Sequence, residues 1–167
     1  MKYNFMITSL DQDKVLVTFK VVGTTFHQDA IDELLAKAMP DFHSEQNGQR
    51  ELTYNNSIIL IPEPDNQYDP NAVKVFVQFL NQPLPIGYLG MEFNWLYLKL
   101  INELKFTLSD QPSLQIIQRD PICVGNNEDG TPKYEEFNDE FLGQFILYCK
   151  SSNICNIWNR IDISPLW

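Results

Sequence analysis

The feature that most constrains the fold is a turn-rich loop set between two apolar runs. Residues 57–61 (SIILI) and 72–80 (AVKVFVQFL) are rich in β-branched and aromatic residues, and residues 62–71 between them read PEPDNQYDPN. β-branched and aromatic residues favour strands, whereas Pro, Asp and Asn favour turns through a fixed φ or through side-chain bonds to the backbone. The segment therefore predicts two strands joined by an ordered loop.

Alternating apolar residues predict further strands on both sides of this segment. Residues 14–22 alternate, which predicts a strand with one buried face. That face carries Val15, Val17, Phe19 and Val21. Other expected strands are 86–89 (IGYL), 113–119 and 143–150, and residues 157–167 are a candidate edge strand.

Two segments have helical periodicity. Residues 29–39 predict a helix with Asp29 as its N-cap and Pro40 as its stop, and residues 91–104 predict a second helix. The polar segments 41–56 and 125–140 predict surface loops, the second with an Asp-Gly turn. Five or more strands and two helices without regular βαβ units predict an α+β, mostly β fold built on a small barrel.

Composition limits the partners and the location of the chain. Its 12 basic and 22 acidic residues give a net charge of −10. Most nucleic-acid affinity comes from basic groups that displace counterions, so any nucleic-acid contact is expected to be confined to a small pocket. No apolar run is long enough to cross a membrane or to serve as a signal peptide, which predicts a cytoplasmic protein without membrane contact.

The cysteines and histidines do not indicate a metal or a cofactor. Cys123, Cys149 and Cys155 are widely spaced, and His27 and His43 are the only histidines. No CxxC or HxxxH pair occurs, so neither a disulfide framework nor a zinc site is expected. The simplest interpretation makes the cysteines buried small hydrophobic residues.

The loop at residues 62–72 is the densest candidate site, and four interpretations compete. A calcium loop is rejected because Pro70 follows Asp69 where the EF-hand turn requires Gly. A carboxylate pair for hydrolysis lacks any supporting catalytic motif. The third interpretation, in which Asx turns and prolines only shape the loop, is the one that the residue types alone favour. A binding loop is the fourth, because Tyr68 can stack on a base or sugar and Asp69 can accept a hydroxyl bond.

The loop and its flanking strands resemble the HIRAN family. The resemblance rests on Glu63–Val75 (EPDNQYDPNAVKV), on Ile86–Leu89 (IGYL) and on Val21–Phe26 (VVGTTF). It covers residues 14–105, the expected HIRAN-like core of a single domain spanning 1–167. Residues 106–167 are then expected to form a C-terminal β extension packed on the same barrel, which the resemblance implies is OB-like with two flanking helices.

The resemblance also implies a ligand, the 3′-hydroxyl end of single-stranded DNA. Tyr68 and Phe26 correspond to stacking positions, Asp69 to the acceptor of the terminal hydroxyl, and Asn66 lies nearby. Tyr88, in the IGYL strand, is expected to be half exposed by alternation.

The chain departs from the pattern of the DNA-end binders at two positions that contact phosphate. Thr25 stands where they place an arginine just before the aromatic residue. Gly90, Met91 and Glu92 stand where they place basic residues after the IGYL strand. Both losses lower the expected affinity for a nucleic-acid backbone.

We therefore expect a non-catalytic module that binds single-stranded DNA ends, with a role in DNA repair or processing. Its candidate site residues are Thr25, Phe26, Asn66, Tyr68, Asp69 and Tyr88. The alternative is a protein–protein interaction module whose acidic surface and extra strands bind a partner or a second copy, as a homodimer, without DNA.

Overall fold

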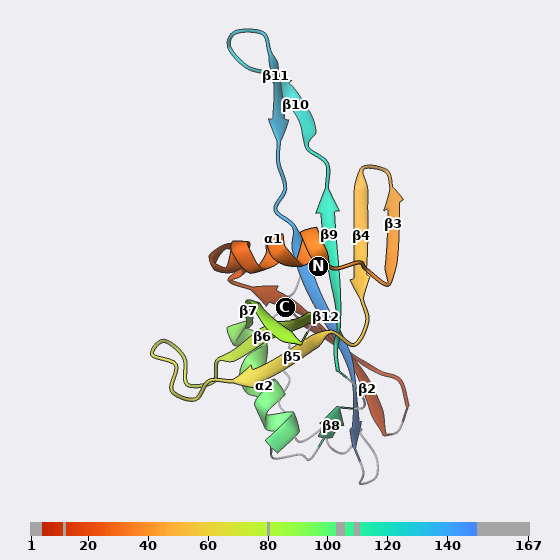
Figure 1. Cartoon of the computed structure of the whole chain (residues 1–167), viewed down its shortest axis with the longest axis vertical. Coiled ribbons are helices and arrows are strands. Elements are labelled where there is room, and N and C mark those ends of the chain that lie inside the picture. Colours follow the sequence, from red (N-terminus) through yellow and green to blue (C-terminus); the bar gives the residue numbers. More distant parts are fainter. Residues whose placement is uncertain (1–4, 12, 80, 103–105, 109–110, 150–167) are drawn as a thin grey trace.

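The structure, a computed structural model, describes residues 5–11, 13–79, 81–102, 106–108 and 111–149 (Figure 1). The strands are β1 (Phe5–Ser9), β2 (Lys14–Val22), β3 (Phe42–Gln46), β4 (Gln49–Tyr54), β5 (Ile58–Pro62), β6 (Val73–Phe79), β7 (Gln82–Leu89), β8 (Phe106–Leu108), β9 (Ser113–Arg119), β10 (Ile122–Asn126), β11 (Pro132–Glu135) and β12 (Glu140–Cys149). The helices are α1 (Gln28–Lys37) and α2 (Met91–Asn102), and a short 3₁₀ helix, η1 (Thr24–His27), precedes α1. The chain is thus mostly β with two helices, as the sequence predicts.

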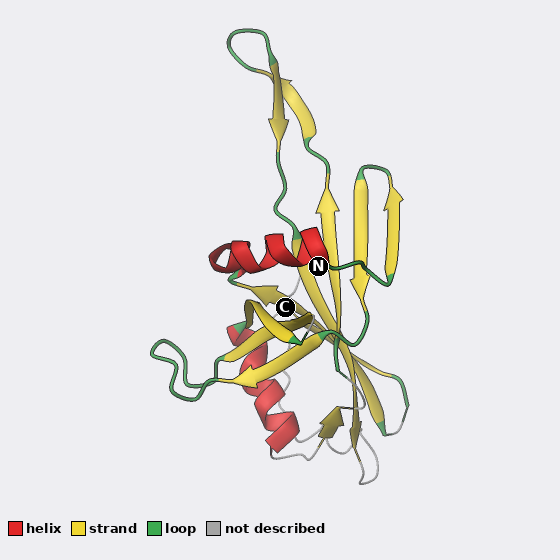
Figure 2. Ribbon diagram, viewed as in Figure 1, coloured by secondary structure: helices red, strands yellow, loops and turns green. Residues whose placement is uncertain are grey.

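One antiparallel sheet contains all described strands except β10 and β11 (Figure 2). Its order is β3-β4-β9-β12-β2-β7-β6-β5, with β1 also paired to β2 and β8 to β12. The first part of β2 pairs with β12, and only Val21 and Val22 at its end pair with β7. β2 therefore joins the β5–β7 meander to the rest of the sheet. Among the described strands no pairing of β3 with β5 closes the path, so the OB-like barrel stays a prediction.

The strands after residue 105 lie within the sheet. β9 and β12 fill the positions between β4 and β2, and β12 pairs with β2 over seven residues from Leu142 to Tyr148. Because β2 and β12 are neighbours, chain segments more than 100 residues apart form the middle of the sheet. The division into a core (14–105) and an extension (106–167) stays a prediction.

Several expected elements are confirmed. β2 has the expected bounds and buries alternate residues, Val15 to Val21, at 2% exposure or less. The strand at 113–119 has the expected bounds, and the strands at 57–61 and 72–80 each begin one residue later than expected. The helix expected at 91–104 begins at Met91 as predicted, and residues 80, 103 and 104 lie outside the described residues. The strand expected at 143–150 begins earlier, at Glu140, and the IGYL strand begins at Gln82.

Other expectations are wrong. The segment 41–56 is a hairpin of β3 and β4. The segment 125–140 is a loop only in part, because β10 and β11 pair as a hairpin there, with the expected Asp-Gly turn between them. The helix expected from residue 29 begins at Gln28, so Asp29 lies in its first turn and is not its N-cap. Cys123 is exposed, which contradicts its interpretation as a buried residue. The candidate strand at 157–167 lies outside the described residues.

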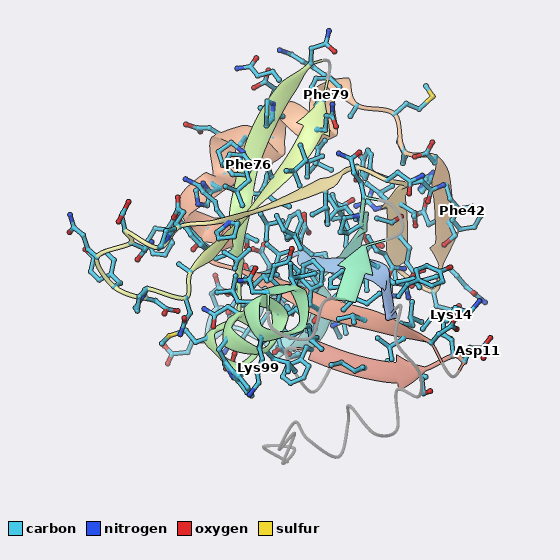
Figure 3. All side chains as sticks on the ribbon, turned by 90° about the horizontal axis from the view of Figure 1, so that it is seen from below. Asp11, Lys14, Phe42, Phe76, Phe79 and Lys99 are labelled. Atoms are coloured by element: carbon cyan, nitrogen blue, oxygen red, sulfur yellow. The ribbon has the colours of Figure 1, made fainter. Side chains whose placement is uncertain are left out.

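The core is formed by the sheet and both helices, and α2 lies beside the sheet (Figure 3). The ring of Phe93 on α2 stacks on Phe5 and Phe19, with ring centroids 5.1 Å and 5.9 Å away. Tyr97, one turn later, meets Phe145 of β12 edge-on at 6.0 Å. These five rings come from β1, β2, α2 and β12, and their packing anchors α2 firmly, since each ring removes a large apolar area from water. Neither helix of the described residues is long and apolar enough to cross a membrane.

Candidate nucleic-acid interface

A cleft of about 430 Å³ opens where three chain segments meet. The turn after β2, the β5–β6 loop and the junction of β7 with α2 each supply part of its wall. The lining residues are Val22, Gly23, Phe26, His27, Asn66, Tyr68, Asp69, Ala72, Tyr88, Leu89, Met91 and Asn94. Five of the six residues that the sequence singles out therefore lie around one cleft; Thr25, exposed beside Phe26, does not line it.

The β5–β6 loop is held in shape by its own side chains. Oδ1 of Asn66 accepts bonds from the backbone N–H groups of Tyr68 (2.9 Å) and Asp69 (3.1 Å). The backbone N–H of Glu63 donates to the carbonyl of Ala72, which closes the base of the loop at 2.8 Å. Asx side chains thus give the loop a defined shape, as their residue types indicate. Asn66 shapes the loop from within, and its direct contact with a ligand stays a prediction.

Asp69 has both carboxylate oxygens held. Oδ1 accepts the backbone N–H of Asn71 at 2.8 Å, and Oδ2 accepts the side-chain amide (Nδ2) of Asn94 at 2.6 Å. Asn94 lies on α2 and is only 3% exposed. Each carboxylate oxygen can accept a second bond, so Asp69 stays able to receive a hydroxyl from a ligand.

Asn94 is a site residue that sequence reasoning missed. It lies between Phe93 and Trp95, near the start of α2. A buried amide requires a hydrogen-bond partner. Its burial is visible only in the structure, so the sequence pattern did not indicate this contact.

Two aromatic rings border the cleft and are almost fully exposed. The side chain of Phe26 is 88% exposed and that of Tyr68 is 93% exposed. Phe26 is therefore not part of the core. Gly23 sets up the turn, because its φ of +71° lies in the left-handed region that Gly adopts most easily, and its carbonyl accepts the N–H of Phe26 at 3.2 Å. Exposed aromatic rings beside a cleft provide stacking surfaces for flat ligands.

Tyr88 forms the floor of the cleft between the β5–β6 loop and η1. Its hydroxyl donates to Oε1 of Glu63 at 2.9 Å. Burial, and then the hydrogen bond and charge of Glu63, raise the pKa of Tyr88 above its ordinary value. Gly87 precedes it, and a Cβ at Gly87 would overlap the backbone carbonyl of Val22, so this strand needs a glycine to approach β2 closely.

A family model, the HIRAN domain, matches residues 14–144. This chain belongs to the HIRAN family. HIRAN domains are nucleic-acid-binding modules, and the match extends beyond residue 105, through β9 and into β12. Neither the curated proteins nor the solved structures include a match.

The charges around the cleft of this HIRAN domain are mixed. Asp69 lines it and Glu63 bonds to its floor. Nζ of Lys74 lies 5.7 Å from the ring centroid of Tyr88, within cation–π range. Burial, and then the charge of Lys74, lower the pKa of His27 below its ordinary value, so His27 is neutral at neutral pH.

Arginines do not contribute to the cleft among the described residues. Arg50 lies on β4 with its guanidinium 3.9 Å from Asp120, and Arg119 lies on β9 at 3.2 Å from Glu140. Within the same described ranges no three His, Cys, Asp or Glu side chains come close enough to hold a metal ion. The HIRAN cleft therefore offers stacking surfaces and hydrogen-bond groups, and Lys74 places a positive charge beside Tyr88.

Proposed function

We propose that this HIRAN domain binds the 3′-hydroxyl end of single-stranded DNA without catalysing a reaction. The observation that carries the proposal is the placement of Asp69, a fixed acceptor, in a cleft bordered by the exposed rings of Phe26 and Tyr68. The rings would stack on the last bases, and Asp69 would accept the hydrogen bond of the terminal hydroxyl. Free DNA ends occur during DNA repair and processing, so the protein would act in one of these.

The size of the cleft supports a terminal nucleotide as the ligand. Its volume of about 430 Å³ is at the lower end of the range for small-molecule sites, roughly 300–1,000 Å³. A long strand usually needs an extended positive groove, and this acidic chain of net charge −10 is poorly suited to one. A short end held by stacking and one acceptor fits the cleft better.

The charge of Asp69 supports a hydroxyl over a phosphate at the end. A carboxylate accepts a bond from a hydroxyl but repels a phosphate, and Asn94 already supplies the adjacent amide donor. A bond to a charged group contributes about 1.5–3 kcal/mol, so we expect roughly a tenfold to hundredfold preference for the hydroxyl.

The test compares 5′-labelled oligonucleotides that end in a 3′-hydroxyl or a 3′-phosphate by fluorescence anisotropy. Asp69→Asn should remove most of the preference while keeping the shape of the side chain. Asp65→Asn is the matched control, because Asp65 lies in the same loop, is exposed and does not line the cleft. Equal binding of the two ends by the unaltered protein, or no binding of either at millimolar DNA, would rule out the proposal.

A second candidate function has its own structural support in the hairpin of β10 and β11. The hairpin extends away from the main sheet (Figure 1) and forms a separate two-stranded sheet. It exposes Ile122 (55%), Val124 (51%) and Tyr134 (58%). Isolated hairpins are marginally stable in water, so an apolar hairpin of this kind is a candidate for docking on another protein.

The charge of the hairpin favours a basic partner. Glu128, Asp129, Glu135 and Glu136 are exposed in and beside it, against one lysine, Lys133. The test is a nuclease-treated pull-down with the full chain and with a variant whose residues 122–135 are replaced by a short Gly-Ser turn. A basic protein retained only by the full chain supports this function, and equal recovery by both removes it.

A further inference from the structure

The structure assigns to His27 a role that the sequence did not indicate. We propose that His27 contacts the phosphate of the bound terminal nucleotide in its protonated form, so that DNA binding is tighter at mildly acidic pH. This inference rests on the proposed function, since it concerns the same cleft. It adds His27 to the residues that contact the DNA, and it adds the uptake of a proton to the binding reaction.

Among the residues that line the cleft, His27 is the candidate for contact with the phosphate. A terminal nucleotide carries one phosphate on its 5′ side, and the cleft must accommodate that charge. Of the twelve lining residues, His27 alone has a side chain that can become positive in the ordinary pH range. The other polar residues of the lining are Asn66, Tyr68, Asp69, Tyr88 and Asn94, which are neutral or negative.

The position of His27 suits this contact. It directly follows Phe26 in η1, and its ring centroid lies 6.2 Å from that of Tyr88 on β7, at an interplanar angle of 48°. The imidazole is half-buried at the cleft wall, so a ligand in the cleft can reach it while bulk solvent screens it less than a surface charge.

The charged groups around His27 come from several elements. Lys74 of β6 lies beyond the Tyr88 ring and repels a proton on His27. Glu63 of the β5–β6 loop has its Oε1 occupied by the Tyr88 hydroxyl, and Asp69 of the same loop lines the cleft. Asp29 lies in the first turn of α1, and α2 contributes the uncharged Met91 and Asn94.

These surroundings set the direction of the pH effect. In the free protein, burial and then Lys74 lower the pKa of His27, so the ring is neutral at pH 7. A phosphate beside the ring favours its charged form and raises its pKa in the complex. Binding therefore takes up a proton, and affinity rises as pH falls through the pKa of the complex and levels off below the pKa of the free protein.

The size of the effect follows from the kind of ion pair. A partly exposed pair contributes up to about 1 kcal/mol, which corresponds to an increase in affinity of roughly threefold to fivefold between pH 8 and pH 5.5. Lys74 attracts the same phosphate at both pH values, so it raises affinity without adding pH dependence.

The experiment measures binding of a short oligothymidylate with a 3′-hydroxyl at pH 5.5 and pH 8 at fixed ionic strength. Thymine does not titrate in this range, so the DNA stays constant. His27→Gln should bind equally at both pH values, at the level of the unaltered protein at pH 8. His27→Lys should bind tightly at both. His43→Gln is the matched control, because His43 is the other histidine, lies exposed on β3 and should leave the pH profile unchanged.

A direct readout is the NMR titration of the His27 ring, whose pKa should rise when the oligonucleotide is added. Affinity that does not change with pH, or that changes equally in His27→Gln, overturns the role of His27 and leaves end binding intact. Failure of the unaltered protein to bind the oligonucleotide at either pH overturns the proposed function, and this inference with it.

Discussion

The side-chain amide of Asn94, buried in α2, donates a hydrogen bond of 2.6 Å to Oδ2 of Asp69 in the β5–β6 loop. The bond joins a residue of the apolar core to the loop that carries the family motif. Because α2 is anchored by Phe93 and Tyr97, it fixes the carboxylate relative to the sheet. The orientation of Asp69 therefore depends on the packing of the core.

Asn94→Ala should weaken recognition of the DNA end more than it weakens the fold. Loss of the amide leaves a partly buried carboxylate oxygen without its donor, which costs about 1–3 kcal/mol of unfolding free energy. The preference for a 3′-hydroxyl over a 3′-phosphate should fall as Asp69 loses its fixed position. Urea unfolding and anisotropy measure the two effects. Asn102→Ala, at the exposed end of the same helix, should change neither.

Phe26→Ala and Tyr68→Ala should each reduce affinity without destabilising the protein. Both rings are more than 85% exposed, so their removal costs little apolar burial in the fold. Stacking of a base on an aromatic ring contributes about 1–3 kcal/mol, which predicts a loss of affinity of roughly fivefold to hundredfold per ring. Phe42→Ala is the control, since Phe42 is 59% exposed on β3 and does not line the cleft. Unaltered affinity in both cleft variants would show that the rings are not stacking surfaces.

The salt dependence of DNA binding should be shallow. The slope of log affinity against log salt is about −0.7 for each phosphate neutralised on a single strand. At pH 8 His27 is neutral, the described residues that line the cleft include no lysine or arginine, and Lys74 lies beside Tyr88. We therefore expect a slope of about −0.7 or shallower. A slope of about −3 or steeper would mean that several cations contact the backbone, which contradicts an end-binding cleft.

Tyr97→Phe should make the protein more resistant to alkaline unfolding. Burial raises the pKa of Tyr97 from 10.0 to about 12 in the folded protein. Between these values the hydroxyl ionises in the unfolded chain but not in the folded one, so stability present below pH 10 is lost as pH rises toward 12. The variant should lose less stability over that window in urea unfolding at successive pH values. Tyr134→Phe, whose ring is 58% exposed on the hairpin, should behave like the unaltered protein.

Apolar periodicity predicted the elements that bury a face. β2 alternates buried and partly exposed residues along its whole length, and this pattern fixed its bounds correctly. The β3–β4 hairpin was missed because most residues of β3 are exposed on both faces, so its sequence FHSEQ shows no apolar alternation. A turn signal, Asn47-Gly48 with both φ values positive, was nevertheless present between the two strands.

The motif residues of the candidate site could be predicted from the sequence. Phe26, Asn66, Tyr68, Asp69 and Tyr88 come from three separate segments, and the structure brings them to one cleft. His27 and Asn94 were not predictable by the same route. Their importance depends on which groups of distant elements face them, namely Lys74 for His27 and Asp69 for Asn94. Such long-range contacts are set by the sheet order and leave no periodic trace in the sequence.

The most direct measurement of the central claim compares linear and circular single-stranded oligonucleotides of the same sequence and length. A circle presents the same bases and phosphates without a free end. We predict that the unaltered protein binds the linear form with its 3′-hydroxyl at least about tenfold more tightly than the circle, a difference of about 1.4 kcal/mol. Equal affinity for the two forms would contradict end recognition and would assign the cleft of Asp69 to another ligand.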